Sequence, residues 1–222
     1  MLSSADQDYI KAIYSLQTEG GPVTTSSLAA LLGVTSASVS GMLAKLSRAG
    51  MVRHNRYRGV RLTERGRLAA LKVLRRHRLI ELFLVETLGL PWDKVHQEAE
   101  NLEHVISDQL EQRMDELLGH PEFDPHGAPI PSLSGLIADS GDVRLGEAKP
   151  PCRGRISRVS DSDPELLRYL SRLGLVPGAN VTLHEVLGFD GTVVVQVGKR
   201  RHHVSPAVAA SVWITEHEGG KG

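Results

Sequence analysis

The chain has 222 residues, 41% of them hydrophobic and 23% charged, a composition typical of a folded soluble protein with room for more than one domain. No stretch is apolar over the length of a membrane span, and the N-terminus lacks a basic segment followed by an apolar run. We therefore expect a cytoplasmic protein with no membrane partner.

The net charge of zero hides an uneven distribution along the chain. Residues 1–70 contain nine Lys/Arg against four Asp/Glu and carry +5, residues 71–140 carry −7, and residues 141–222 carry +2. The basic first segment favours a polyanionic partner, and the acidic second segment favours cations.

The first third of the chain predicts a helix-turn-helix. The pattern DQDYIKAIYSL places Tyr9, Ile10 and Ile13 on one side of a short helix over residues 6–16. A second helix over residues 25–32 is closed by Gly33, and Thr35 caps a third helix that runs to Gly50. Two short helices across a tight glycine turn are typical of this DNA-binding motif.

The stretch MVRHNRYRGVRLTERG that follows predicts a basic two-stranded wing with a turn in residues 54–59. Arginines of such a ribbon suit phosphates, and the small side chains that begin the third helix allow close approach to a groove. Because those small side chains lack bidentate groups, we expect DNA shape to supply much of the specificity. The candidate DNA-contacting residues are Thr35, Ser36, Ser38, Ser40, Lys45, Arg56 and Arg58.

Two further helices are expected, one from Thr63 to Gly89 and one from Lys94 to Gly119. The second contains KVHQEAENLEHVISDQLEQR, which places His96, Glu100, Glu103 and His104 on one face at i, i+4, i+7 and i+8. An apolar stripe on the adjoining arc puts this polar face beside a core, where a divalent metal would offset the cost of burial. A solvated charged face is the simpler alternative.

A second pair of candidate ligands, His77 and Glu81, is spaced i, i+4 on the preceding helix and predicts a second metal site beside His96. The two helices also carry more apolar surface than one small winged helix needs. We expect a homodimer interface there, with burial inside the monomer as the competing interpretation. The apolar residues concerned are Val85, Leu88, Leu90, Trp92, Met114, Leu117 and Leu118.

The C-terminal part changes character. Residues 141–153 are expected to form a linker, and short alternating segments from Gly154 onward predict a small, partly open β-barrel with one helix at residues 164–173. The lone cysteine, Cys152, is interpreted as a reduced thiol without a role.

Taken together, these segments resemble the diphtheria toxin repressor and manganese transport regulator family of metal-dependent transcriptional regulators. The resemblance rests on DYIKAIYSL, RYRGVRLTERG, RRHRLIELFL, KVHQEAENLEHVISDQLEQR and FDPHGAPIP. It implies a mainly α fold with a winged helix-turn-helix (1–70), a helical metal-binding and dimerisation domain (71–140), a linker (141–153) and an SH3-like, FeoA-like barrel (154–217).

The resemblance further implies a homodimer that binds operator DNA with a metal as corepressor, and no small-molecule substrate. The implied primary ligands are Asp8, Glu100, Glu103 and His104, and the implied ancillary ligands are His77, Glu81 and His96. The barrel can add Asp161, Asp163 and Glu165, whose alternative role is helix capping.

The implied metal is Mn(II), with Fe(II) as the alternative and Zn(II), Co(II) or Cd(II) as possible substitutes. Iron-responsive members of the family commonly have sulfur ligands at the positions of Asp8 and Glu100. In this chain both residues are carboxylates, as in manganese-responsive members. Lys11 stands where short manganese-responsive members carry a glutamate, so a closely spaced metal pair is not expected.

Three functions are compatible with these features. The first is a metal-activated repressor of manganese or iron uptake genes, which is not an enzyme. The second is a dinuclear-metal hydrolase, which would need an open coordination position and leaves the basic wing without a role. The third is a winged-helix protein whose acidic face is merely solvated, which predicts no metal dependence.

Overall fold

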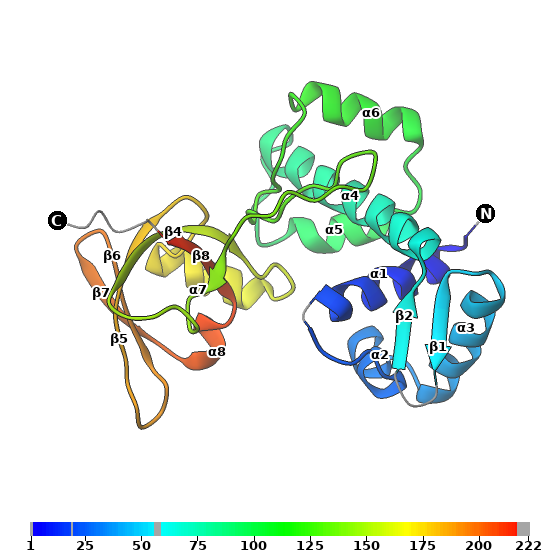
Figure 1. Cartoon of the computed structure of the whole chain (residues 1–222). Helices are drawn as coiled ribbons and strands as arrows, with labels where there is room; N and C mark the ends of the chain where they lie inside the picture. The colour runs from blue at the N-terminus through cyan, green and yellow to red at the C-terminus, as the bar shows by residue number, and fades with distance from the viewer. Residues whose placement is uncertain (1, 19, 56–58, 217–222) are drawn as a thin grey trace. The chain divides into compact units, whose positions relative to one another are not determined.

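Figure 1 shows a computed structural model of the chain, which describes residues 2–18, 20–55 and 59–216. The chain divides into two compact units. Unit 1 comprises residues 1–77, 102–107 and 131–136, and unit 2 comprises residues 78–101, 108–130 and 137–222. The long helix α4 (Glu64–Glu86) contributes its first part to unit 1 and its second part to unit 2.

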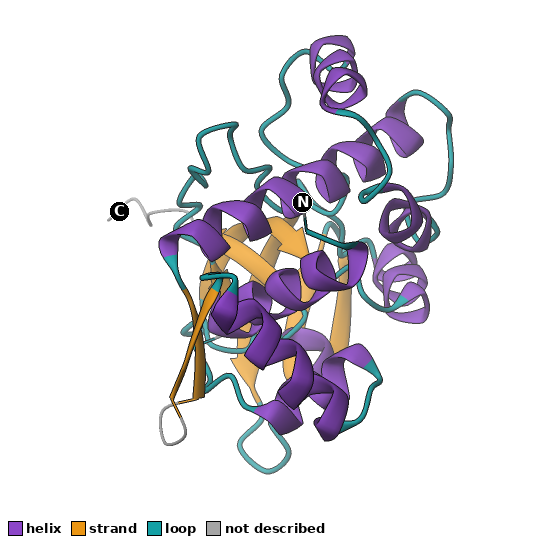
Figure 2. Ribbon diagram, turned by 90° about the vertical axis from the view of Figure 1, so that its right-hand side faces the viewer, coloured by secondary structure: helices purple, strands orange, loops and turns teal. Residues whose placement is uncertain are grey.

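Unit 1 contains the expected helix-turn-helix and wing strands. Helices α1 (Ser4–Thr18), α2 (Thr25–Leu32) and α3 (Ser36–Arg48) pack against one another, and β1 (Val52–Asn55) pairs antiparallel with β2 (Gly59–Leu62) (Figures 1 and 2). The local sequence explains the helix boundaries. The Thr24 side chain forms a capping box with Ser27, Gly33 ends α2 in the left-handed conformation, and the Thr35 hydroxyl accepts a hydrogen bond from Ser38 N at 3.2 Å.

The core of unit 1 joins α1 to the other helices, because Ile10, Ile13, Leu28, Val39 and Leu43 are all fully buried. The second wing strand is fixed to the segment before α2, where Val60 N donates to Val23 O at 2.9 Å. A Cβ at Gly59 would lie 2.5 Å from that same oxygen, so only glycine allows the approach.

Among the described helices, no single one is long and apolar enough to cross a membrane. Helices α2 and α3 reach that length and composition only when taken together, across a bend of 109°.

The structure corrects the prediction of one helix from Lys94 to Gly119. The segment forms two helices, α5 (Val95–Leu102) and α6 (Asp108–Leu117), with turns between them. Two β-branched residues, Val105 and Ile106, disfavour the helix at the break, and the acidic Asp108 and Glu111 in the first turn of α6 favour a new start. Glu103 and His104 therefore lie beyond the end of α5, and the single four-residue helix face is wrong.

Unit 2 contains the expected small barrel, a six-stranded antiparallel sheet in the order β3-β8-β4-β5-β6-β7. Its strands are β3 (Val143–Arg144), β4 (Cys152–Val159), β5 (Asn180–Val186), β6 (Val193–Val197), β7 (Arg200–Val204) and β8 (Val212–Glu216). Helix α7 (Pro164–Leu173) buries Leu167 and Leu170 against Ile156, Leu183 and Val195 of the sheet.

Two parts of the barrel differ from the sequence prediction. Part of the expected linker forms β3 (Val143–Arg144), which pairs with β8 (Val212–Glu216), and Leu145 is fully buried in the barrel core. The strand β8 and the short helix α8 (Pro206–Ala209) were not predicted. The alternating apolar residues Val143 and Leu145 were the available signal for β3, but they lie in a short stretch rich in glycine and charge.

Candidate metal centres and nucleic-acid interface

A first cluster of metal-ligating side chains lies in unit 1. Asp8 comes from α1, and Glu103 and His104 come from the turns between α5 and α6. One donor atom of each lies within 4.8 Å of the others, with His104 Nε2 at 2.7 Å from Asp8 Oδ1 and 3.4 Å from Glu103 Oε1. The cluster therefore connects the first helix of the DNA-binding segment to the chain that follows α5.

Glu103 is the most deeply buried member of this cluster, with a fully buried side chain. Its Oε1 lies 2.6 Å from Lys11 Nζ, and its Oε2 lies 2.6 Å from His77 Nδ1. A buried carboxylate needs such partners, because an uncompensated charge in the interior is costly.

The imidazole of His104 is oriented by a second residue of α1. His104 Nδ1 lies 3.0 Å from Gln7 Oε1, and an amide oxygen can only accept, so Nδ1 carries the proton. Nε2 is the ring nitrogen that faces Asp8 and Glu103, so it is the atom through which His104 would bind a metal.

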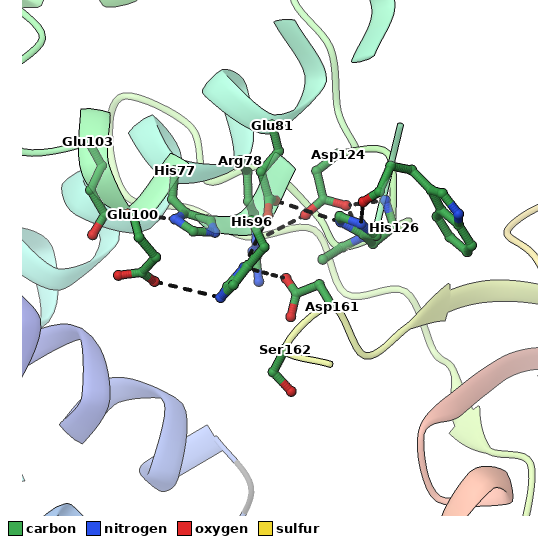
Figure 3. Close-up of polar contacts among 12 residues, drawn as sticks. His77, Arg78, Glu81, His96, Glu100, Glu103, Asp124, His126, Asp161 and Ser162 are labelled. Carbon is green, nitrogen blue, oxygen red and sulfur yellow. Dashed lines mark hydrogen bonds and ion pairs between the residues drawn. The ribbon is translucent and has the colours of Figure 1, made fainter. Parts of the chain in front are cut away.

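A second cluster lies in unit 2, and Figure 3 shows its side chains converging from α4, α5 and the turn after β4. His96 Nδ1 lies 3.2 Å from Glu81 Oε1 and 3.9 Å from Asp161 Oδ2. Glu81 is fully buried, whereas His96 and Asp161 are partly exposed. The structure thus brings together Glu81, His96 and the barrel residue Asp161.

Two residues that the sequence analysis did not select extend this second cluster. Donor atoms of Glu81, Asp124, His126 and Asp161 lie within 4.8 Å of one another. His126 Nε2 donates to Trp92 O at 2.8 Å, which leaves Nδ1 as the lone-pair nitrogen of the neutral ring, 3.7 Å from Glu81 Oε2. The sequence signal was available as the Asp-x-His-Gly pattern in FDPHGAPIP, which served only to support the family resemblance.

The arrangement around His126 suits a cation. Within the described part of the chain, the buried atom His126 Nδ1 has no hydrogen-bond partner, and Asp124 Oδ2 has an ion pair with Arg78 Nε at 3.5 Å but no hydrogen bond. A lone pair facing a carboxylate at 3.7 Å is unfavourable unless a proton or a metal lies between the two atoms. One imidazole nitrogen and three carboxylates are a donor set for Mn(II), Fe(II) or Zn(II), so the residues fit a divalent metal.

The electrostatics of this cluster follow from its burial and its charges. Burial by itself lowers the pKa of His126, but the interaction with Glu81 and the charges of Asp124 and Asp161 outweigh it and raise the pKa to about 9. Burial, assisted by the charge of Glu81, raises the pKa of Asp124 above its usual range, against the opposing effect of Arg78. Protons thus neutralise part of the acidic charge that a metal would neutralise.

The loop that carries Asp124 and His126 is fixed against the barrel. Val159 N donates to His126 O at 2.9 Å, and Asp124 Oδ1 accepts from the backbone N–H groups of His126 and Ala128. Gly127 has φ +84°, and a Cβ there would lie 2.0 Å from Ser157 O. Glycine is required at this position both by the backbone conformation and by the close contact.

The remaining predicted ligands have other neighbours or remain predictions. Glu100 lies on α5 with Oε1 3.8 Å from His96 Nε2, and His77 lies one turn before Glu81 on α4. Asp163 is the N-cap of α7, where its Oδ1 accepts from Glu165 N and Leu166 N. The capping role accounts for Asp163, and we leave it and Glu165 out of the ligand set proposed below.

The candidate DNA-contacting residues of α3 lie on its exposed surface, namely Thr35, Ser36, Ser38, Ser40 and Lys45. Lys45 Nζ also lies 2.6 Å from Asp6 Oδ1. Burial alone would raise the pKa of Asp6, but the hydrogen bonds from Lys45 and Ser3 and the positive charge of Lys45 hold this pKa below its usual value. The ion pair ties α3 to α1. Arg56 and Arg58 lie outside the described residues and remain predictions.

Comparisons with known proteins identify the family. Residues 1–60 match the family model "Iron dependent repressor, N-terminal DNA binding domain", residues 63–132 match "Iron dependent repressor, metal binding and dimerisation domain", and residues 143–216 match the FeoA domain. Over 199 residues the chain is 35% identical to the iron-dependent repressor IdeR of Mycobacterium tuberculosis, covering 84% of this chain and 86% of that protein. The chain belongs to the iron-dependent repressor family.

Other relatives are similar over nearly the whole chain. The diphtheria toxin repressor of Corynebacterium glutamicum is 30% identical and covers 95% of this chain and 96% of its own. A solved structure described as a manganese-dependent transcriptional repressor in complex with manganese is 37% identical, with a TM-score of 0.90, and covers 95% of this chain and 99% of its own. ScaR with bound Cd2+ is 32% identical, with a TM-score of 0.86 over 96% of this chain and 99% of its own.

Family membership confirms the main sequence predictions. The chain is a metal-dependent, DNA-binding transcriptional repressor and not an enzyme, with a DNA-binding domain, a metal-binding and dimerisation domain and a FeoA domain. It binds a divalent metal. The hydrolase and the solvated-face alternatives are therefore set aside.

Proposed function

We propose that the chain is a Mn(II)-activated repressor that acts in the cytoplasm as a homodimer on operator DNA of metal-uptake genes. Asp8, Glu103 and His104 would hold one metal, with Glu100 as a further ligand. Glu81, Asp124, His126 and Asp161 would hold a second, with His96 and His77 beside it. The ranges 1–70 and 71–140 remain our proposed boundaries for the DNA-binding and dimerisation domains. We extend the proposed barrel range of 154–217 back to Val143, because β3 pairs with β8.

One observation carries this proposal, namely that the first cluster joins α1 to the segment after α5. Helix α1 packs against α2 and α3, so a constraint on Asp8 is a constraint on the recognition helix. A bound cation supplies the positive charge that Asp8 and Glu103 share. When the metal is bound, Asp8 and Glu103 fix α1, and this lowers the entropy cost of ordering the DNA-binding helices. Metal binding and DNA binding are therefore coupled.

The choice of Mn(II) rests on the donor atoms. Both clusters offer only carboxylate oxygens and imidazole nitrogens, and Cys152 lies on β4, outside either donor set. Hard oxygen donors suit Mn(II) and Fe(II), while Zn(II) can bind such sites more tightly, so metal availability also decides which ion activates the protein. The identity to iron-dependent repressors supports an Fe(II)-responsive regulator as the second candidate.

The homodimer is supported by apolar side chains that stay exposed near the ends of the helices. Leu88 is 56% exposed, Leu117 66% and Leu110 48%, whereas Met114 is buried within the monomer. The exposed leucines are suited to a two-fold interface, and a dimer would place two recognition helices on one DNA site.

The ligand assignment is tested by counting bound Mn(II) in chelator-treated protein, using the electron paramagnetic resonance signal of free Mn(II). We expect two bound ions per chain, with His104→Ala removing one and His126→Ala removing the other. An unchanged count in either variant refutes the corresponding site. Repeating the titration anaerobically with Fe(II), and comparing the DNA affinity of the two loaded forms, separates the two candidate metals.

A further inference from the structure

The carboxylate of Glu103 already holds a cation that belongs to the chain itself. Lys11 Nζ lies 2.6 Å from Glu103 Oε1, and the lysine side chain is 15% exposed while that of Glu103 is fully buried. The other oxygen, Oε2, lies 2.6 Å from His77 Nδ1. Each oxygen of this carboxylate therefore has a partner from the chain itself at 2.6 Å.

The ammonium group lies at the edge of the first metal-ligating cluster. Lys11 and Asp8 are three residues apart on α1 and so point to the same side of the helix. Glu103 Oε1, which Lys11 contacts, is also 3.4 Å from His104 Nε2, and that nitrogen is 2.7 Å from Asp8 Oδ1. A divalent cation among these three donors would need the oxygen that Lys11 contacts, at a distance where two positive charges repel strongly.

We propose that Lys11 is a built-in competitor for the metal. Its ammonium neutralises Glu103 when no metal is bound, and it leaves Oε1 when a divalent cation binds to Asp8, Glu103 and His104. The inference rests on the proposed metal-binding role of those three residues. Lys11 thereby raises the metal concentration at which the site fills, while it keeps the metal-free fold stable.

The chemistry of lysine suits this exchange. Its charge sits on a flexible four-carbon stem, and the side chain is partly exposed, so the ammonium can move to solvent without a change in the backbone. Glu103 has no such freedom, because it is fully buried and its other oxygen contacts His77. The lysine is therefore the partner that moves.

A purely supporting role for Lys11 predicts the opposite effect. If Lys11 only held Glu103 in a conformation suited to the metal, its removal would weaken metal binding. Competition predicts that removal of the charge strengthens binding. The sign of the change in affinity therefore separates the two roles.

The test compares Mn(II) affinity in full-length protein that also carries His126→Ala, which removes a proposed ligand of the second metal site. Lys11→Met keeps the length of the side chain and removes its charge. We expect it to bind Mn(II) about tenfold more tightly or better, and to melt at a lower temperature without metal, so that Mn(II) raises its melting temperature by more than in the parent. Lys72→Met, at an exposed lysine of the same unit, should change the affinity less than about twofold.

Unchanged or weaker Mn(II) binding in Lys11→Met overturns the proposal. Lys11→Arg keeps the charge and should bind Mn(II) no more tightly than the parent; tighter binding contradicts the competition. If Lys11→Met folds only with metal, the rate at which a chelator removes Mn(II) from the loaded protein gives the same comparison, and release must be slower than from the parent. A parent protein that loses no Mn(II) on His104→Ala would refute the metal site itself, not the role of Lys11.

Discussion

Metal binding at the second cluster should depend steeply on pH, because His126 must lose a proton before its Nδ1 can bind a metal. Burial opposes the charged ring, but Glu81, Asp124 and Asp161 raise the pKa of His126 to about 9. At pH 7, two units below this pKa, removing the proton from the His126 ring costs about 2.7 kcal/mol. This cost lowers the Mn(II) affinity about a hundredfold. We expect Mn(II) affinity to rise about tenfold per pH unit between pH 6.5 and 8.5.

The assay is a Mn(II) titration at pH 6.5, 7.5 and 8.5 in protein that carries His104→Ala, so that only the second cluster is counted. His126→Asn serves as the control, because an amide does not titrate in this range and the slope should flatten. An increase of less than about threefold over the whole range, or an unchanged slope in the His126→Asn protein, would refute the reasoning.

The same protonation affects the metal-free fold with the opposite sign. His126 has a raised pKa in the folded state, so its stabilising contribution is complete below the unfolded value near 6.5 and is lost as the pH rises through about 9. The raised pKa of Asp124 has the same sign, but its contribution is lost between about pH 4 and pH 7, so it adds little to the change above pH 6.5. The free energy of unfolding of chelator-treated protein should fall by up to about 3 kcal/mol between pH 6.5 and 9.

Three further substitutions have defined outcomes. Gly127→Ala places a Cβ 2.0 Å from Ser157 O at φ +84° and should lower the free energy of unfolding by about 2 kcal/mol or more, seen as a lower melting temperature; an unchanged value contradicts the contact. Gln7→Ala removes the acceptor for His104 Nδ1 and should weaken Mn(II) binding about tenfold. Gln7→Glu keeps an acceptor oxygen and should keep the Mn(II) affinity. Equal losses of affinity in the two variants would contradict an orienting role for Gln7. Thr35→Ala removes the cap of α3 and should cost about 1 kcal/mol in urea unfolding; no loss would show that the cap contributes nothing.

The sequence was most informative where the pattern is local. Helix α3 begins and α2 ends where Thr35 and Gly33 predict, because capping and left-handed glycine are properties of a few adjacent residues. The barrel strands β4 to β7 were recognised from their alternation. The strand β3 was missed, because two residues are too few to show the alternation of a strand. Its pairing with β8 also depends on a segment about 70 residues away.

The candidate sites show a similar division. His96 and Glu81 were paired from helical spacing, and the structure places them 3.2 Å apart. Asp124 and His126 were not selected, because a loop has no period and their approach to Glu81 depends on the contact of Gly127 with β4. The break after α5 was also missed, since an apolar stripe continues in register across it.

The central claim is that metal binding and DNA binding are coupled. Its most direct test is fluorescence anisotropy of labelled DNA from upstream of this gene and of metal-transporter genes, with chelator-treated protein and titrated Mn(II). The account predicts saturable, sequence-selective binding that requires Mn(II) and is lost in His104→Ala protein. Binding of equal affinity with and without metal would contradict it.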